Sequence, residues 1–280
     1  MKILVTGGCG FIGKALVKEL LLKGNEVDVI DNLYIGREAT NVDGANFLGG
    51  DIRAMENIPN KNYDLIYHLA AYSRVLSSYE HNDLTFSVNV MGTKNVLEYA
   101  RKNKCKVIFA SSSSIHHSIS PYASSKAMGE ELCNFYRVGY DVPVTIVRLY
   151  NVYGPGELVD SHMAAVIGKW RKQVRNGKPI TINNNGLDKK AFTHIDDVVD
   201  GLIRLIDTDQ YNFNGWEMGN TTTYSINEVY EMFVEKFGAI ETIDTHYRLG
   251  GWPDGSRKNN DVQRLGWYPK DRLKEYINSL

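Results

Sequence analysis

The 280-residue sequence contains only three cysteines, and its positive and negative charges nearly balance. Cys9, Cys105 and Cys133 have neither the spacing of metal ligands nor a paired pattern, so we expect no metal centre and no disulfide framework. A net charge of −1 without a basic stripe argues against nucleic acid or a membrane surface as partner. No apolar run approaches membrane-spanning length, and the first residues resemble a strand more than a signal peptide. These absences favour a soluble cytoplasmic protein.

Strands and helices alternate through about residue 150, which predicts an α/β fold with a Rossmann-type, doubly wound parallel sheet. Expected strands cover 1–5, 26–30, 47–52, 65–71, 106–110 and 144–148, and expected helices cover 84–102 and 122–137. Beyond residue 156 the elements become shorter, with helices expected at 162–175, 196–207 and 225–237. We predict a nucleotide-binding domain at 1–155 and a smaller substrate-binding lobe at 156–280, with elements that can be exchanged between the two.

A glycine-rich turn directly follows the first predicted strand. Gly7 permits a tight turn, Gly10 lets backbone N–H groups approach phosphates, and Gly13 lets the next helix pack closely on the strand. The second strand ends at Asp31, whose carboxylate can accept the hydroxyls of an adenosine ribose and would repel a 2′-phosphate. The pattern predicts a dinucleotide site that favours NAD over NADP, although Arg37 lies only six residues beyond Asp31.

Tyr122 and Lys126 are four residues apart on a predicted helix and therefore share one face. A free tyrosine, with a pKa near ~10, is a poor base, but a neighbouring ammonium and a cationic nicotinamide ring both favour its phenolate. Four serines at 111–114 end the preceding strand, and one of their hydroxyls can hydrogen-bond the substrate oxygen. An incidental Tyr–Lys pair on a surface helix is the alternative. The position of the pair, after the serine run and beyond a dinucleotide site, favours a general base.

Taken together, these motifs resemble those of the extended short-chain dehydrogenase/reductases, in particular the NAD-dependent sugar-nucleotide epimerase/dehydratase branch. The similarity runs nearly from end to end of the chain. Besides the glycine turn and Tyr122/Lys126, it includes Asp31-Asn32-Leu33, Gly50-Asp51-Ile52-Arg53, His68-Leu69-Ala70-Ala71, Asn89-Val90-Met91-Gly92-Thr93, the segment 148–156, His194-Ile195-Asp196-Asp197-Val198 and Leu265-Gly266-Trp267.

The resemblance implies roles for individual residues. Ser112 is the catalytic hydroxyl, Tyr122 the base, and Lys126 the ligand of the nicotinamide ribose. The implied cofactor-binding residues are Gly7, Gly10, Phe11, Ile12, Gly13, Asp31, Asn32, Asp51, Ile52, Leu69, Ala70, Ala71, Asn89, Tyr122 and Lys126. The implied substrate-binding residues are Asn151, Val166, Lys190 and Arg248, with Arg257 as a competitor for the last position. The family also implies a homodimer formed through the helices at 84–102 and 122–137.

The resemblance further implies a reaction. Ser113 and Ser114 stand where the dehydratases carry an Asp-Glu pair and the decarboxylases keep the glutamate. This favours a 4-epimerase acting on UDP-glucose, UDP-galactose or their N-acetyl forms, which removes a hydride from sugar C4, turns the keto intermediate and returns the hydride to the other face.

Two alternatives stay open. Segment 253–258 resembles the epimerase/reductases of the GDP-fucose synthase type, but Ser114 replaces their cysteine and Asp31 opposes NADPH. A non-catalytic NAD-binding regulatory or assembly protein is the alternative from another class, although such a protein has no need of a base.

Three features depart from the family pattern. Only ten residues separate Ser112 from Tyr122, Leu149 replaces a tyrosine, and histidines stand at 116 and 117 in place of a Tyr-Gly pair. The short connection can still bridge a strand end and a helix start. The two histidines could assist proton transfer or contact phosphates, but without an evident partner they are better interpreted as loop residues half in solvent.

Overall fold

The computed structural model describes residues 1–280 except 37–39, 60, 117–118, 209–211 and 246–253. In the part of the chain that it describes, the central element is a seven-stranded parallel sheet with the order β11-β6-β5-β4-β1-β2-β3. Its strands are β1 (Lys2–Thr6), β2 (Glu26–Asp31), β3 (Asn46–Gly49), β4 (Leu65–His68), β5 (Lys106–Ser112), β6 (Val144–Leu149) and β11 (Trp216–Met218). This confirms the predicted fold class. Strand order reverses between β1 and β4, which is where ligands bind in such sheets.

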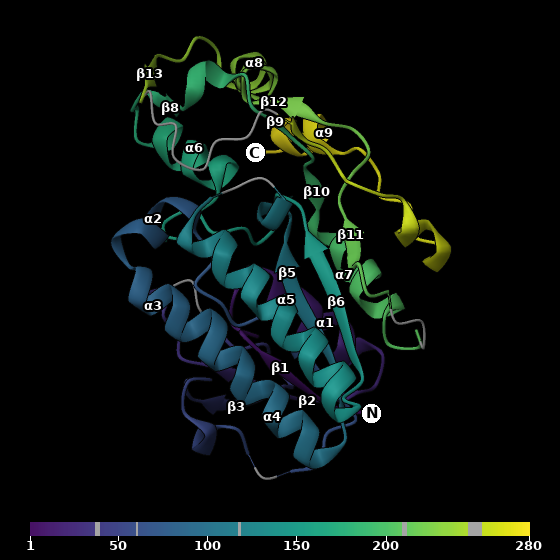
Figure 1. Ribbon diagram of the computed structural model, residues 1–280. Coiled ribbons are helices and arrows are strands. Elements are labelled where there is room, and N and C mark those ends of the chain that lie inside the picture. The colour runs from purple at the N-terminus through teal and green to yellow at the C-terminus, as the bar shows by residue number, and fades with distance from the viewer. Residues whose placement is uncertain (37–39, 60, 117–118, 209–211, 246–253) are drawn as a thin grey trace.

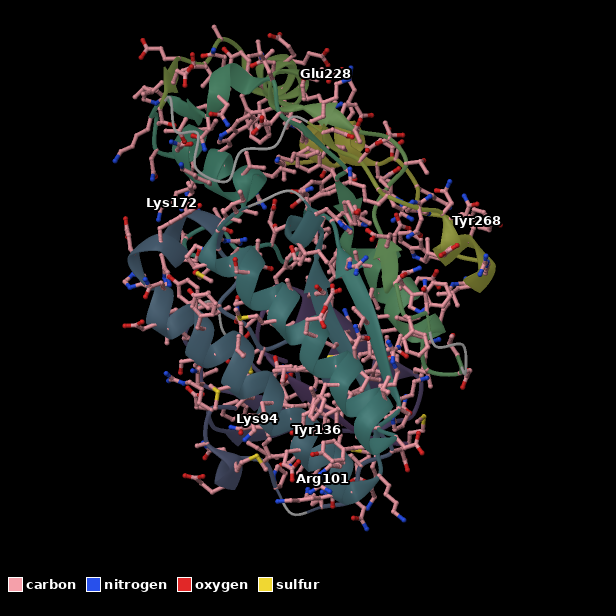
Figure 2. The ribbon with its side chains drawn as sticks, viewed as in Figure 1. Lys94, Arg101, Tyr136, Lys172, Glu228 and Tyr268 are labelled. Atoms are coloured by element: carbon pink, nitrogen blue, oxygen red, sulfur yellow. The ribbon has the colours of Figure 1, made fainter. Side chains whose placement is uncertain are left out.

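Helices cover both faces of the sheet, so side chains on both faces of its inner strands are buried. Ile3, Leu4 and Val5 in β1 are fully buried. One face packs against α1 (Phe11–Leu22) and α7 (Ile195–Arg204), and the other against α4 (Thr93–Asn103) and α5 (Pro121–Tyr140) (Figure 1). At the end of these helices away from the smaller lobe, Tyr136 of α5 lies close to Arg101 of α4 (Figure 2).

The smaller lobe lies beyond the carboxyl ends of the strands (Figure 1). Its helices α6 (Val166–Arg175), α8 (Ile226–Phe237) and α9 (Leu273–Asn278) share a core that includes Trp170, Phe233 and Ile277. Its short strands are β7 (Val152–Tyr153), β8 (Ile180–Ile182), β9 (Lys189–Lys190), β10 (Thr193–His194), β12 (Tyr224–Ser225), β13 (Thr242–Asp244) and β14 (Asp254–Gly255). Strand β11 and helix α7 follow residue 156 in sequence but pack with the main sheet, and the domain boundary at 155/156 stays a prediction.

Two helix predictions differ from the structure. The helix expected at 84–102 is divided into α3 (Asn82–Phe86), a π-helical turn η3 (Ser87–Gly92) and α4. Gly92 packs so tightly there that a Cβ would lie 2.5 Å from Ile52 Cδ1. The helix expected at 162–175 begins only at Val166, and the residues just before it also line a cavity. None of the helices in the described ranges is long and apolar enough to cross a bilayer.

Candidate active site

A cavity of about 860 Å³ lies at the carboxyl ends of the strands, a size typical of ligand pockets. It brings together nearly all of the residues that the sequence predicts for the site. Its lining includes Gly7, Gly10, Phe11, Ile12, Gly13, Asp31, Asn32, Asp51, Ile52, Leu69, Ala70, Ala71, Ser112, Tyr122, Lys126, Asn151, Val166 and Lys190. Asn89 does not line the cavity, and Arg248 falls outside the described residues.

The glycine turn leaves room for a ligand because it lacks side chains. Gly7 has a φ of +74°, and a Cβ there would lie 2.7 Å from the backbone nitrogen of Ala70. A Cβ on Gly13 would lie 2.2 Å from the Gly7 carbonyl oxygen, so α1 can approach the turn only with glycine at this position. Helix α1 starts after Gly10 without a side-chain cap, which leaves N–H groups of its first turn for an anion. This cradle fits a dinucleotide pyrophosphate.

Two carboxylates line the cavity together with the glycine turn. Asp31 accepts hydrogen bonds from the backbone N–H groups of Cys9 (3.0 Å) and Leu33 (2.8 Å). Burial raises the pKa of Asp31 and outweighs these two bonds. Asp51 accepts from Arg53 and from Asn32, and chiefly the Arg53 bonds lower its pKa to about 2. The position of Asp31 at the end of β2 fits recognition of an adenosine ribose, as predicted for NAD. Arg37 lies outside the described residues.

Tyr122 is fixed at the start of α5 by local capping. Pro121 is the first residue of the helix, and the Ser120 hydroxyl accepts the Ala123 N–H at 3.1 Å. Ser78 in α2 (Val75–Glu80) accepts the Tyr122 N–H at 3.1 Å. The Tyr122 side chain lies at the end of β5, close enough to the Ser112 hydroxyl for this group to act on the pKa of Tyr122.

The charged groups around Tyr122 include one that the sequence did not mark. Burial raises the pKa of Tyr122, while the hydrogen bond with Ser112 and the positive charge of Arg74 act to lower it. Lys126 donates to the Ala110 carbonyl at 2.7 Å and lies over the Phe109 ring, and burial lowers the pKa of Lys126 to about 8. Arg74 is thus a cation beside Tyr122 that the sequence did not mark, and the role of Lys126 in favouring the phenolate stays a prediction.

Side chains of other strands of the main sheet hold the short connection that follows β5. It begins with a 3₁₀ turn, η4 (Ser113–His116), and His116 Nε2 lies 2.8 Å from Glu217 Oε1. Glu217 on β11 is fully buried and also binds Arg148 of β6 at 2.8 Å. Arg148 in turn holds Glu130 of α5. His116 therefore has a partner that the sequence did not reveal, while His117 lies outside the described residues.

Asn89 sits in the π-helical turn and positions the cavity wall instead of forming it. Its side chain accepts the Tyr72 N–H at 2.8 Å and donates to the Tyr72 carbonyl at 3.0 Å and to the Ser125 hydroxyl at 2.9 Å. The loop after β4 is thereby tied to α5.

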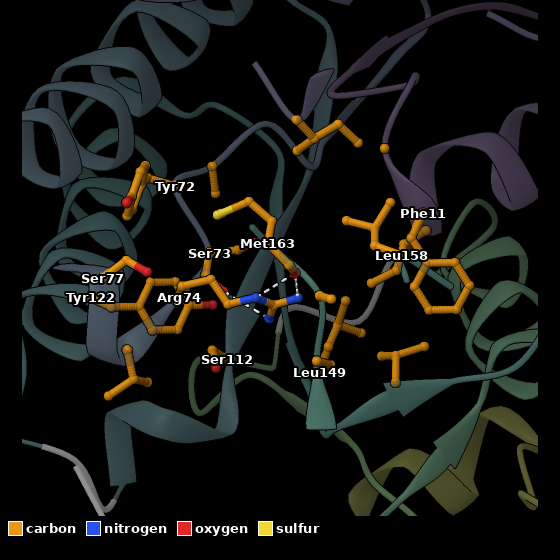
Figure 3. Close-up of a pocket in the computed structure, with 18 of the residues that line it drawn as sticks. Phe11, Tyr72, Ser73, Arg74, Ser77, Ser112, Tyr122, Leu149, Leu158 and Met163 are labelled. Carbon is orange, nitrogen blue, oxygen red and sulfur yellow. Dashed lines mark hydrogen bonds between the residues drawn. The ribbon is translucent and has the colours of Figure 1, made fainter. Parts of the chain in front are cut away.

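The predicted substrate residues lie on the side of the cavity near the smaller lobe. Asn151 donates to the Ala191 carbonyl at 3.2 Å, Val166 is the first residue of α6, and burial lowers the pKa of Lys190. Arg74 was not predicted from the sequence; it lies three residues beyond Ala71 and points into the cavity beside Tyr122 (Figure 3). No motif marks it. Its place just after the carboxyl end of β4 is the signal that could have found it.

Three comparisons relate the chain to known proteins. A model described as the NAD dependent epimerase/dehydratase family matches residues 3–215. The chain is 31% identical over 257 residues to a UDP-N-acetyl-alpha-D-glucosaminuronate decarboxylase of Bacillus cytotoxicus, across 81% of this chain and 78% of that protein. It resembles the crystal structure of UDP-glucose 4-epimerase from Thermotoga maritima with UDP-glucose. The TM-score is 0.90 and the identity 26%, and the match covers 99% of this chain and 96% of that one. It also resembles the crystal structure of UDP-glucose 4-epimerase of Thermus thermophilus in complex with NAD. The TM-score is 0.89 and the identity 28%, and the match covers 99% of this chain and 97% of that one.

Proposed function

Because the chain belongs to the NAD-dependent epimerase/dehydratase family of extended short-chain dehydrogenase/reductases, we propose that it is a UDP-sugar 4-epimerase. One observation carries the proposal. The Tyr122 phenol meets the Ser112 hydroxyl inside a cavity whose other half fits NAD. A base paired with a hydroxyl at the end of a dinucleotide cradle supports removal of hydrogen from a secondary alcohol.

The residues divide the work of such a reaction. NAD, when bound in the cradle formed by the glycine turn and Asp31, supplies the capacity to accept a hydride and return it. Tyr122 takes the proton of the C4 hydroxyl as its oxygen becomes a carbonyl, and gives the proton back when the alcohol is restored. Ser112 donates a hydrogen bond to the same oxygen, and Lys126 is proposed to hold the nicotinamide ribose. No net oxidation results, and the sugar leaves with its C4 configuration inverted.

The relatives include decarboxylases, so the choice between the two reactions needs its own support. Ser113 and Ser114 line the cavity directly after Ser112, and neither offers a carboxylate there. Glu130 and Glu217, two buried glutamates behind these serines, are bound by Arg148. Glu157, a buried glutamate that lines the cavity, is bound by Arg171 and Tyr276. This arrangement supports epimerisation over decarboxylation. The same Ser114 argues against the GDP-fucose synthase chemistry, which needs a cysteine.

The proposal extends to binding partners and location. Asn151, Val166 and Lys190 are proposed to contact the nucleotide sugar, with Arg248 as a further predicted contact. Exposed apolar side chains on α5, among them Phe135 and Val138, support a homodimer formed through this face. Sedimentation equilibrium should then give twice the chain mass of 31.6 kDa. The three free cysteines are buried and unpaired with one another, which suits a cytoplasmic location.

The direct test incubates NAD-loaded protein with UDP-glucose, UDP-galactose, their N-acetyl forms and UDP-glucuronate, then separates the sugars and measures CO2. The wild type should interconvert at least one C4 pair, and Tyr122→Phe should lower the rate by about 10²–10⁴-fold. Tyr140→Phe, at a half-exposed position of the same helix, is the matched control. Release of CO2 would assign the chain to the decarboxylases. Bound NAD with no turnover of any sugar would favour a non-catalytic protein.

A further inference from the structure

Arg74 is a cation on the cavity wall whose observed bonds all go to neutral groups. Its Nε and Nη2 donate to the Met163 carbonyl and its Nη1 to the Ser73 carbonyl, as the dashed lines in Figure 3 show. Among the described residues, no carboxylate forms an ion pair with this guanidinium. Its side chain is half-buried, and its remaining surface faces the cavity.

This arrangement is electrostatically incomplete. A guanidinium removed from much of its solvent without a counter-ion is costly, and carbonyl dipoles supply no net charge. Of its five N–H groups, three point to carbonyls, which leaves one on each terminal nitrogen. Two such N–H groups side by side match the two oxygens of a carboxylate. The missing anion is therefore expected to come with the ligand.

The position of Arg74 indicates which part of the ligand carries that anion. Figure 3 shows the guanidinium beside Tyr122 and Ser112, and its charge lowers the pKa of Tyr122. The anion must then lie close to the carbon on which these residues act. The diphosphate is proposed to lie by Lys190, on β9 of the smaller lobe. In a hexopyranose C4 is bonded to C3 and C5. C3 carries a neutral hydroxyl, whereas C5 carries C6, which is a carboxylate in hexuronic acids, so the anion corresponds to an acid at C6.

We propose that Arg74 binds the C6 carboxylate of a UDP-linked hexuronic acid, and that the substrate is this acid rather than a neutral UDP-hexose. The inference rests on the proposed function, since it takes Tyr122 to act at C4. It adds a specificity-determining residue that makes no bond in the reaction itself.

The test measures binding of UDP-glucuronate and UDP-glucose to the NAD-loaded protein by calorimetry, and separately measures turnover of both. The wild type should bind UDP-glucuronate at least 10-fold more tightly than UDP-glucose. Arg74→Gln should weaken the binding of UDP-glucuronate by about 100-fold and that of UDP-glucose by less than 3-fold, because only the carboxylate loses its partner. Arg74→Lys keeps the charge but not the two parallel N–H donors of the guanidinium, so its affinity for UDP-glucuronate should lie between those of the wild type and Arg74→Gln. Arg175→Gln, at an exposed ion pair on α6, is the control.

The outcomes separate the carboxylate assignment from the proposed reaction. Equal weakening of both sugars by Arg74→Gln would show that Arg74 is a brace between the 72–75 loop and Met163, and would overturn the carboxylate assignment. Equal affinity of the wild type for the two sugars would overturn it as well, even if Arg74→Gln fails to fold. Selective binding of UDP-glucuronate without any C4 inversion would leave the carboxylate site standing and overturn the proposed reaction instead.

Discussion

The two halves of the cavity are built in different ways. The cofactor half consists of the glycine turn and Asp31, which the chain brings together over a separation of 22 residues through the Cys9–Asp31 bond. It works through backbone N–H groups and missing side chains. The substrate half depends on side chains from distant segments, since Arg74 and Met163 are 89 residues apart and His116 and Glu217 are 101 apart. A local motif can specify the first half, whereas the second exists only after folding.

The largest effect should come from the side-chain network under the substrate half. Glu217→Gln removes the buried charge that binds His116 and Arg148, and should lower the free energy of unfolding by about 3 kcal/mol. Because the cofactor half is built independently, the dissociation constant of NAD should change by less than 3-fold while turnover falls. Urea unfolding and NAD titration measure the two quantities.

The pH dependence of this loss has a defined sign. Burial would raise the pKa of Glu217, but bonds from His116, Tyr150 and Arg148 hold it below the ordinary value. The stabilisation by Glu217 is therefore fully present above about pH 4.3, the pKa of a glutamate in the unfolded chain. It is lost as the pH falls through the lower pKa that Glu217 has in the folded protein. The free energies of unfolding of the wild type and Glu217→Gln should therefore converge in acid. Glu235→Gln, at an exposed pair with Lys274, should cost less than about 0.5 kcal/mol. Equal losses in the two variants would contradict a structural role for the network.

Lys126 of α5 is buried against the end of β5, and its ammonium predicts the next effect. Burial lowers its pKa to about 8, against an unfolded value near ~10.4. Between these pH values the unfolded chain binds more protons, so stability rises with pH. The stability of the wild type relative to Lys126→Met should therefore increase by up to about 3 kcal/mol from pH 7 to pH 10.5. Unfolding at a series of pH values checks it, with the exposed Lys172→Met (Figure 2) as control. A flat difference would mean that Lys126 is solvated.

The halves also differ in how much the sequence could predict. The doubly wound sheet, the glycine turn and Asp31 follow from apolar strands and from the special φ of Gly7, both local properties. The π-helical turn at Ser87–Gly92 could not be predicted, because the apolar spacing of this segment is that of a regular helix; its Gly92 packs against Ile52, which is distant in sequence. Arg74 and the partner of His116 were missed for the same reason. Their roles are set by residues about a hundred positions away in the sequence, Met163 and Glu217.

A change of one methyl group tests the backbone character of the cofactor half. Gly13→Ala places a Cβ 2.2 Å from the Gly7 carbonyl oxygen, and neither backbone can move without opening the turn. We expect a loss of about 1–3 kcal/mol in stability and markedly weaker NAD binding. Gly139→Ala in α5, where the nearest atom is 3.6 Å away, should be neutral or slightly stabilising. Normal NAD binding by Gly13→Ala would show that the motif is not a cradle.

The smallest effect concerns the choice of cofactor, and it separates charge from shape at Asp31. Asp31→Asn keeps an oxygen that can accept the Cys9 N–H but removes the charge that would repel a 2′-phosphate. The affinity ratio of NADP to NAD should rise by about 10-fold, which corresponds to about 1.4 kcal/mol. Asp188→Asn, on the substrate side of the cavity, should leave the ratio unchanged. An unchanged ratio in Asp31→Asn would mean that cofactor choice also depends on a contact outside the 7–31 segment, and the cofactor half would then be no more local than the substrate half.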